Sequence, residues 1–251
     1  MLPPISVVIP AFNEAVRIGD TLAVTIAYLE KESPTSEVIV VNDGSTDSTG
    51  KVFRKVSAVP SSVAIRLLEN FPNRGKGAAV RTGLSSATKS IGVFFDADLS
   101  TPIDELPKIV DPIARGEVDI AFGSRALDRK LIGNRQPWRR EQGGRVFNLV
   151  VRLATDLPFW DTQCGFKAFR MEACRPIIEA ARVIGFGFDV ELLLLAQCAG
   201  LRLREIPVRW NHHEGSKIQL VSDSVRMLRE VLSLRAKNAV IPNPKGEGSH
   251  S

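Results

Sequence analysis

Two carboxylates separated by one residue, Asp96 and Asp98, follow an apolar run at residues 92–95. Side chains with this spacing at the end of a strand can bind the same cation. Their hard oxygen ligands suit Mg²⁺ or Mn²⁺, ions that proteins commonly share with the phosphates of a substrate. The segment is also compatible with a turn in which an aspartate caps a helix that starts near Thr101. Taken alone, the pair leaves a metal site and a turn equally open.

A further acidic residue, Asp43, follows the apolar run at residues 38–41. From the end of a strand, its carboxylate could accept hydrogen bonds from a base or a ribose. The glycine and serine that come next also form a turn that caps the following helix, and this is the favoured interpretation of the segment by itself. Asn13 and Glu14 present the same two possibilities, a helix cap or a ligand contact.

Positive side chains occur in two places where a phosphate could bind. Residues 73–77 read Asn-Arg-Gly-Lys-Gly at the entry to a predicted helix, where backbone N–H groups and Lys76 could meet a phosphate. The glycine spacing is not that of a P-loop. Arg125 follows a predicted strand directly, and a guanidinium group can bind phosphate in bidentate fashion. Later arginines such as Arg139 could equally belong to a solvated helix face.

Short apolar runs alternate with helical patterns through the first half of the chain. We expect buried strands at residues 5–9, 38–41, 63–68, 92–95 and 118–122. Asn13 is predicted to cap a helix that runs from Glu14 to about Lys31. This alternation predicts an α/β fold with a mainly parallel sheet covered by helices on both faces. The polar clusters then lie at the carboxyl ends of strands, where such sheets bind ligands.

The second half of the chain is more irregular. We expect helices at about 139–154, 188–199 and 221–237, and strands at about 165–170 and 201–210. The last of these helices has an apolar stripe with basic residues beside it. Such a helix can lie on an anionic membrane surface, although packing of the stripe against the domain is the simpler explanation. Residues 241–251 are polar, and this tail is predicted to be disordered.

The overall composition limits the kinds of partner. The chain has 251 residues and a formal net charge of +5, which fits a phosphate-rich partner such as nucleic acid, anionic lipid or a nucleotide. Its three cysteines match no disulfide or zinc pattern, which favours a reducing compartment such as the cytoplasm. The sequence shows no charged and then apolar leader. No apolar run approaches the ~20 residues needed to span a bilayer.

These clusters, in this order along the chain, resemble the family 2 glycosyltransferases, which have the GT-A fold, a Rossmann-like α/β arrangement. The match is closest to the dolichyl-phosphate glucosyltransferase and dolichyl-phosphate mannose synthase branch. The matching segments are residues 7–14, 40–47, 73–77, 95–98, 123–125, 161–167, 188–192 and 215–217. The resemblance implies a single domain over residues 1–240, with a nucleotide-sugar-binding half (1–125) and an acceptor half (126–240).

The resemblance also implies a role for each matching residue. The nucleoside pocket would be lined by Pro10, Phe12, Glu14 and Asp43. The metal ion, Mg²⁺ or Mn²⁺, would be held on the donor diphosphate by Asp96 and Asp98. Other substrate contacts would come from Lys76, Arg139, Gln163, Asp189 and Glu191, of which the last two would face the sugar and the acceptor. The catalytic set would comprise Asp98, Asp161 and the phosphate-binding Arg125 and Lys217.

The activity implied by the resemblance is inverting transfer of a sugar, with glucose from UDP-glucose as the expected donor, to a polyprenyl phosphate such as dolichyl phosphate. A phosphate monoester has a second pKa of roughly 6, so this acceptor is a dianion at neutral pH and needs no strong general base. Asp161 is therefore a candidate for either orientation or proton transfer.

Two departures from the family pattern keep other interpretations open. The glucosyl branch usually carries a transmembrane anchor before this domain, and none is seen here. Ser100 stands where the mannosyl synthases usually have Gln. The alternatives are a GDP-mannose donor or a soluble acceptor, and a non-enzymatic nucleotide-binding domain is the least favoured. We expect a cytoplasmic protein that can lie peripherally on the cytoplasmic face of a membrane and has no nucleic-acid partner.

Overall fold

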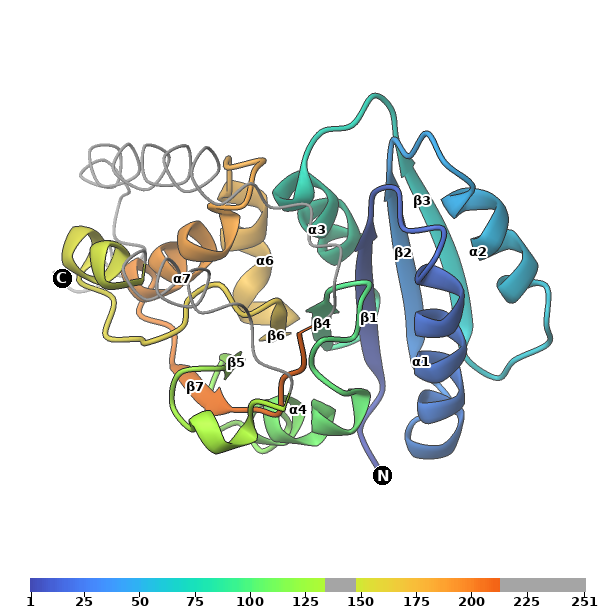
Figure 1. The fold of residues 1–251 in the computed structure, drawn as a ribbon. Coiled ribbons are helices and arrows are strands. Elements are labelled where there is room, and N and C mark those ends of the chain that lie inside the picture. Colours follow the sequence, from blue (N-terminus) through green and yellow to red (C-terminus); the bar gives the residue numbers. More distant parts are fainter. Residues whose placement is uncertain (134–147, 213–251) are drawn as a thin grey trace, which may run out of the picture.

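The computed structural model describes residues 1–133 and 148–212, and these contain one seven-stranded β-sheet (Figure 1). The strands are β1 (Ile5–Ala11), β2 (Glu37–Asp43), β3 (Ala64–Asn70), β4 (Ile91–Phe95), β5 (Ile120–Ser124), β6 (Phe166–Arg170) and β7 (Leu203–Pro207). Their order across the sheet is β3-β2-β1-β4-β6-β5-β7. Of the described strands, only β6 runs antiparallel to its neighbours. The predicted α/β fold with a mainly parallel sheet is confirmed.

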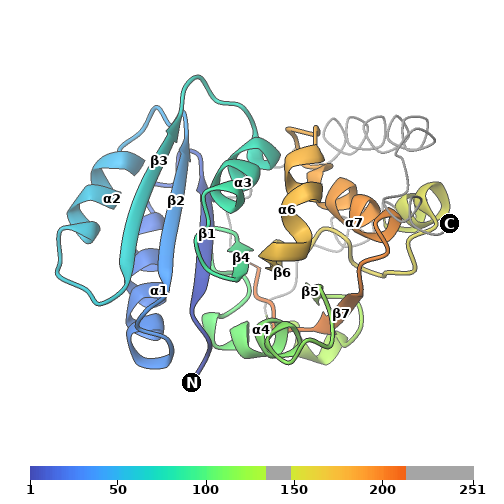
Figure 2. The same ribbon diagram turned by 180° about the vertical axis from the view of Figure 1, so that it is seen from behind.

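Helices cover both faces of the sheet (Figures 1 and 2). One face carries α1 (Ile18–Glu32), α2 (Thr49–Ser57) and α4 (Leu106–Ala114), and the other carries α3 (Lys76–Ser85), α6 (Met171–Ala180) and α7 (Phe188–Cys198). Successive residues of a strand point to opposite faces, so Val7 packs with the first set of helices and Val8 with the second. Because both faces are covered, the central strands are near-continuous apolar runs, which is the pattern visible in the sequence.

The strand β6 lies between β4 and β5 and runs against both of them. The register pairs Phe95 of β4 with Phe166, and Phe122 of β5 with Lys167. Because β6 begins where its neighbours end, the residues that precede it arrive at the carboxyl ends of β4 and β5. The short strand predicted in this part of the chain is confirmed, and its direction brings residues 161–165 to that edge of the sheet.

The predicted helix start at Glu14 is wrong, because α1 begins at Ile18. Asn13 does not cap this helix. Its backbone has a left-handed φ of 54°, and its Oδ1 accepts hydrogen bonds from the N–H groups of Thr46 (2.8 Å) and Asp47 (3.3 Å). Asparagine adopts this conformation more readily than most residues do. The side chain therefore joins the loop after β1 to the loop after β2.

Other predicted elements differ in their bounds or lie outside the described residues. The helix start predicted near Thr101 is displaced, because a 3₁₀ turn, η1 (Ile103–Glu105), comes before α4. A second 3₁₀ turn, η2, covers Arg129–Leu131, and residues 148–155 are helical. The predicted helix at 221–237, the tail at 241–251 and the first part of the helix at 139–154 lie outside the described residues.

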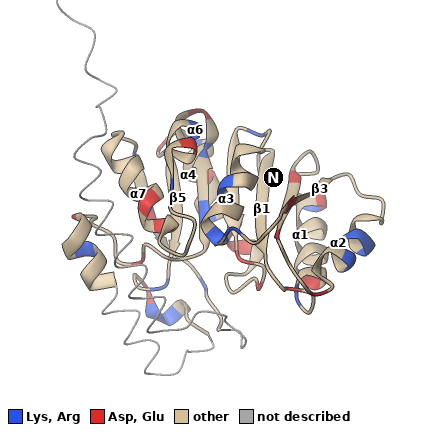
Figure 3. Ribbon diagram, turned by 90° about the horizontal axis from the view of Figure 1, so that it is seen from above, with Lys and Arg blue, Asp and Glu red and all other residues tan. Residues whose placement is uncertain are grey.

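Neither a membrane-spanning helix nor a segregation of charge to one part of the fold is seen in the residues that the structure describes. Among residues 1–133 and 148–212, no helix has both the length and the apolar character that crossing a bilayer requires. Basic residues lie on α2 and acidic residues on α7, so charges of both signs are distributed over the fold (Figure 3).

At the amino end of β5, the buried Asp119 joins three strands. Its carboxylate accepts hydrogen bonds from the Arg202 N–H at 2.8 Å and from Arg170 Nε at 2.9 Å. Arg202 directly precedes β7, and Arg170 is the last residue of β6. Burial opposes ionisation of the group, but the hydrogen bonds from Arg202 and Arg170 outweigh it. The pKa of Asp119 is therefore lowered from its ordinary 3.8 to about 2.

Replacing this carboxylate should weaken the fold in a pH-dependent way. We expect Asp119→Asn to reduce the free energy of unfolding at pH 7 by about 2 kcal/mol, the value of the pKa shift. Because the folded pKa is depressed, this stabilisation is present above the ordinary pKa of 3.8 and is lost as the pH falls through about 2. Urea unfolding at several pH values measures it, with Asp111→Asn on α4, a partly exposed carboxylate, as the control. Equal stability of the Asp119 variant and the parent at pH 7 would contradict the assignment.

Candidate active site

Polar side chains gather at one edge of the sheet, where its parallel strands end. Asp43 is the last residue of β2, Asp96 follows β4, and Arg125 follows β5. The segment that leads into antiparallel β6 brings Asp161 to the same edge, where its carboxylate contacts Arg125. Residues far apart in the sequence are thus placed together because parallel strands share one carboxyl edge and β6 starts there.

The carboxylate pair Asp96 and Asp98 lies directly after β4 and remains partly exposed. The Nζ of Lys76, at the start of α3, lies 2.6 Å from Asp96 Oδ1, and Asp98 Oδ1 accepts the Ser100 N–H at 2.9 Å. Gly165 packs so closely on Asp96 that a Cβ at this position would lie 2.3 Å from Oδ2. A larger residue here would therefore displace the Asp96 carboxylate.

The chemistry of this pair fits a hard divalent cation. Both side chains offer carboxylate oxygens, and the ammonium group of Lys76 shows that the position beside Asp96 attracts positive charge. Among the residues that the structure describes, no group of three Asp, Glu, His or Cys side chains could hold a metal ion. Mg²⁺ sites commonly combine one or two carboxylates with substrate phosphates. The donor set therefore fits an ion that is shared with a phosphorylated ligand.

The buried Asp43 fixes the loop that leads into α3. Its Oδ1 accepts a hydrogen bond from Asn70 Nδ2 at 2.8 Å, and its Oδ2 accepts the Gly75 N–H at 2.7 Å. The Arg74 N–H is shared between both oxygens, at 3.1 and 3.2 Å. This carboxylate therefore positions the Gly- and Lys-containing loop, and its predicted contact with a nucleoside stays a prediction.

The remaining residues predicted for the nucleoside pocket lie on β1 and the loop that follows it. Pro10 is within β1, and Phe12 is a large apolar side chain that is 38% exposed. The Glu14 N–H donates to Thr49 Oγ1 at 2.8 Å, and its carboxylate lies 3.6 Å from Arg17. These contacts place all three residues at the same end of the sheet as Asp43, and their role toward a ligand stays a prediction.

Arg125 and Asp161 form a bidentate ion pair. Arg125 Nε and Nη2 donate to the two carboxylate oxygens at 2.6 and 2.8 Å, and the Arg125 N–H adds a third hydrogen bond at 3.0 Å. The Gln163 N–H also donates to Asp161, at 3.3 Å, and the guanidinium lies 5.7 Å from the Trp210 ring centroid. Burial raises the pKa of Asp161, but the charge and hydrogen bonds of Arg125 outweigh this and lower it. The geometry favours orientation of Arg125 over proton transfer as the role of Asp161.

The two acids of α7 are also paired within the protein. Asp189 Oδ1 accepts a hydrogen bond at 2.5 Å from Lys167 Nζ, whose side chain is fully buried and also donates to the Cys164 carbonyl. The Glu191 carboxylate accepts the N–H groups of Arg182 and Val183 at 2.8 and 2.7 Å. The contacts with sugar and acceptor predicted for Asp189 and Glu191 stay predictions.

Residues 6–178 match the family model for glycosyl transferase family 2. This range contains the carboxylate pair, the loop that Asp43 fixes and both partners of the Arg125–Asp161 ion pair. The chain belongs to glycosyl transferase family 2. It is therefore an enzyme, and the interpretation as a non-enzymatic nucleotide-binding domain is set aside.

Individual relatives of this family 2 glycosyltransferase are similar over most of its length. The dolichyl-phosphate beta-glucosyltransferase of Dictyostelium discoideum is 32% identical, and the match covers 92% of this chain and 73% of that protein. The human dolichyl-phosphate beta-glucosyltransferase is 34% identical, and the match covers 93% of this chain and 75% of the human protein. In three dimensions, glucosyl-3-phosphoglycerate synthase from Mycobacterium tuberculosis, in complex with Mn²⁺, UDP and phosphoglyceric acid, has a TM-score of 0.69 at 22% identity, over 96% of this chain and 80% of that one. The predicted GT-A fold of family 2 is confirmed.

Three further residues, to which the sequence motifs give no role, support this family 2 site. Lys167 holds α7, Trp210 lies beside Arg125, and Glu205 of β7 accepts the Asp161 N–H at 2.7 Å. A lysine inside an apolar strand was the one visible signal, because such a cation needs a buried partner. Arg139 and Lys217 lie outside the described residues, so their predicted roles are not tested.

The Arg125–Asp161 pair generates a prediction about stability in this glycosyltransferase. We expect Asp161→Asn to lower the free energy of unfolding by about 3 kcal/mol, because it leaves the guanidinium without its counter-charge. Adding Arg125→Met to that variant should restore part of the loss, because the uncompensated cation is then removed. Urea unfolding of the two single variants and the double variant measures this. Additive losses in the double variant would mean that the two side chains do not depend on each other.

Proposed function

We propose that this family 2 glycosyltransferase transfers glucose from UDP-glucose to dolichyl phosphate, with inversion at the anomeric carbon. The observation that supports it most is the meeting of the carboxylate pair after β4 with Lys76 and Arg125 at one edge of the sheet, since donor and acceptor are both phosphorylated. The identities of the sugar and of the lipid are inferred from the relatives named dolichyl-phosphate beta-glucosyltransferase. Residues 1–125 would form the nucleotide-sugar half and residues 126–240 the acceptor half of one domain.

On the donor side, the uridine would lie against Pro10, Phe12 and Glu14, at the end of β1. The loop held by Asp43 lies next to this position and presents Lys76 toward the carboxylate pair. A solved structure with the same fold binds UDP, which supports a uridine nucleotide as the donor. Lys76 would then face the diphosphate as well as Asp96.

The metal ion would be Mg²⁺ or Mn²⁺, and Asp96 and Asp98 would hold it; the solved relative contains Mn²⁺ together with UDP. A bound divalent ion neutralises negative charge that develops on a diphosphate leaving group. Gly165 leaves room for the Asp96 carboxylate, because a Cβ at this position would lie 2.3 Å from Oδ2. Lys76 adds a fixed positive charge to the same position.

On the acceptor side, Arg125 and Lys217 would bind the phosphate of the lipid. Asp161 holds two of the guanidinium nitrogens, so Arg125 would meet the phosphate with its remaining N–H groups. The acceptor is already a dianion at neutral pH, so attack on the sugar requires no residue to remove a proton. Asp161 would therefore act by orienting Arg125.

Two alternatives are to be separated from this proposal. One is a soluble phosphorylated acceptor, because the solved relative with the same fold binds phosphoglyceric acid. The other is GDP-mannose as the donor. Incubating labelled UDP-glucose or GDP-mannose with dolichyl phosphate or 3-phosphoglycerate, followed by organic extraction, separates these possibilities. Label that enters the organic phase from UDP-glucose supports the proposal, whereas label that stays in water-soluble product with 3-phosphoglycerate overturns it.

The carboxylate pair should be required for transfer but not for folding. We expect Asp98→Asn to reduce the rate of glucolipid formation by about a hundredfold or more, because a ligand of the charge-neutralising ion is lost. Excess chelator should have the same effect on the parent, and added Mn²⁺ should reverse it. Asp111→Asn, which changes a partly exposed carboxylate on α4, is the matched control and should retain full activity. Full transfer by the Asp98 variant, or by the parent in chelator, would contradict the assignment of Asp96 and Asp98 as metal ligands.

Peripheral contact with the cytoplasmic face of a membrane is part of the proposal, since the lipid acceptor lies there and the chain has a net charge of +5. Each cation near an anionic surface contributes about 1 kcal/mol of attraction, which salt screens. We therefore expect the protein to co-sediment with anionic vesicles at low salt and to dissociate as the salt concentration rises. Neutral vesicles provide the control. Binding to neutral and anionic vesicles alike would contradict an electrostatic contact.

A further inference from the structure

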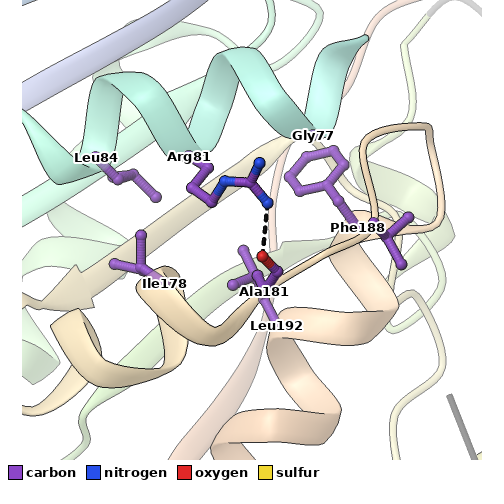
Figure 4. Close-up of a pocket in the computed structure, with 8 residues that line it drawn as sticks. Gly77, Arg81, Leu84, Ile178, Ala181, Phe188 and Leu192 are labelled. Atoms are coloured by element: carbon purple, nitrogen blue, oxygen red, sulfur yellow. Dashed lines mark hydrogen bonds between the residues drawn. The ribbon is translucent and has the colours of Figure 1, made fainter. Parts of the chain in front are cut away.

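The loop at residues 181–187, between α6 and α7, is hydrogen-bonded to α3 at two points, one at the start of the helix and one in its middle. The Ile184 carbonyl accepts the Gly77 N–H at 2.9 Å. The Ala181 carbonyl accepts a hydrogen bond from Arg81 Nη1 at 2.6 Å, across the small apolar pocket between α3, α6 and α7 (Figure 4). The loop therefore supports the first turns of the helix that carries Lys76.

The contact between this loop and α3 is close enough to require glycine in the helix start. A Cβ at Gly75 would lie 2.4 Å from the Ile184 carbonyl oxygen, and a Cβ at Gly77 would lie 2.6 Å from the Val183 carbonyl oxygen. Gly75 also has a φ of +101°, which side chains rarely adopt. The two glycines on either side of Lys76 thus allow the loop backbone to pack directly on the helix start.

Glu191 of α7 holds the loop from the other side. Its carboxylate is 3% exposed and accepts the N–H groups of Arg182 and Val183 at 2.8 and 2.7 Å. A buried carboxylate that accepts two backbone N–H groups has most of its hydrogen-bonding capacity used within the protein. These are the residues immediately before Ile184, so Glu191 determines where the Ile184 carbonyl lies.

Lys76 lies between two residues whose backbone N–H groups are both held by hydrogen bonds. Asp43 accepts the Gly75 N–H at 2.7 Å on the nucleoside side, and Ile184 accepts the Gly77 N–H on the other. With the residues before and after it fixed, Lys76 reaches Asp96, with Nζ 2.6 Å from Oδ1.

We propose that Glu191 is a positioning residue for the donor site, which keeps Lys76 on Asp96 by way of the 181–187 loop. Its carboxylate contacts neither the sugar nor the acceptor. The proposal rests on the proposed binding of a nucleotide diphosphate at Asp96, and it gives Glu191 an indirect part in that binding. The amide of a glutamine at this position could accept one of the two loop N–H groups, but its NH₂ would face the other, so the loop should loosen.

A double-variant comparison tests the proposal through binding of UDP in the presence of Mn²⁺, measured by titration calorimetry. We expect Lys76→Met to weaken UDP binding about tenfold, since a charged contact is lost. Glu191→Gln alone should weaken it about threefold or more, and the double variant should bind no more weakly than Lys76→Met alone. Hydrogen exchange at the Gly77 amide should become faster in Glu191→Gln, because its bond to Ile184 opens more often.

Two further variants separate positioning from a general loss of structure. Arg81→Met removes the other support of the loop and should reproduce the pattern of Glu191→Gln. Arg175→Met is the matched control, because Arg175 also donates to a backbone carbonyl, that of Ala87 at 2.8 Å, but just beyond the far end of α3. It should leave UDP binding unchanged.

The outcomes that overturn the proposal are distinct from those that overturn the function. Losses from Lys76→Met and Glu191→Gln that multiply in the double variant would mean that Glu191 acts independently of Lys76, as a direct substrate contact would. Unchanged UDP binding and unchanged Gly77 exchange in Glu191→Gln would also overturn it. Failure of the unmodified protein to bind UDP would overturn the proposed function instead, while Gly77 exchange would still decide whether Glu191 holds the start of α3.

Discussion

The arrangement of the site depends on one strand that runs against its neighbours. β6 is inserted between β4 and β5, and it begins at Phe166, beside Phe95 at the end of β4. A parallel strand in this place would bring the preceding segment to the opposite edge of the sheet. Because β6 is antiparallel, Gly165 packs on Asp96 and Asp161 meets Arg125. The same strand carries the buried lysine that anchors α7, so it sets the position of that helix as well.

The charges of the site are arranged as ion pairs with different exposure. Arg125 and Asp161 form a bidentate pair in which the carboxylate is almost fully buried, and separating them would leave an unpaired charge in the interior. In the pair formed by Lys76 and Asp96, the carboxylate is 38% exposed, so this contact can exchange for contacts with a charged ligand at lower cost. A site built this way keeps its shape through the buried carboxylates and leaves the exposed Asp96 carboxylate to respond to the ligand.

Backbone contacts between loops complete the site. Asn13 joins the loops after β1 and β2, Asp43 fixes the loop after β3, and Glu191 fixes the loop before α7. In each case a side-chain oxygen accepts N–H groups from a loop that lacks partners in the sheet, and for Asp43 and Glu191 this satisfies partly buried groups that would otherwise be costly to bury. Several acids that the sequence marks as possible ligand contacts therefore have a structural partner in the fold.

The sequence by itself determined the α/β class, the buried strands and the edge at which the polar clusters lie. These follow from local properties, because a strand covered on both faces must be a continuous apolar run and its carboxyl end is then defined. The motifs around Asp43 and Asp96 could be found for the same reason. Only the tertiary structure decided the direction of β6 and the partners of each acid, such as Asp161 with Arg125. Those depend on contacts between residues far apart in the chain, and no local pattern encodes which carboxylate receives which cation.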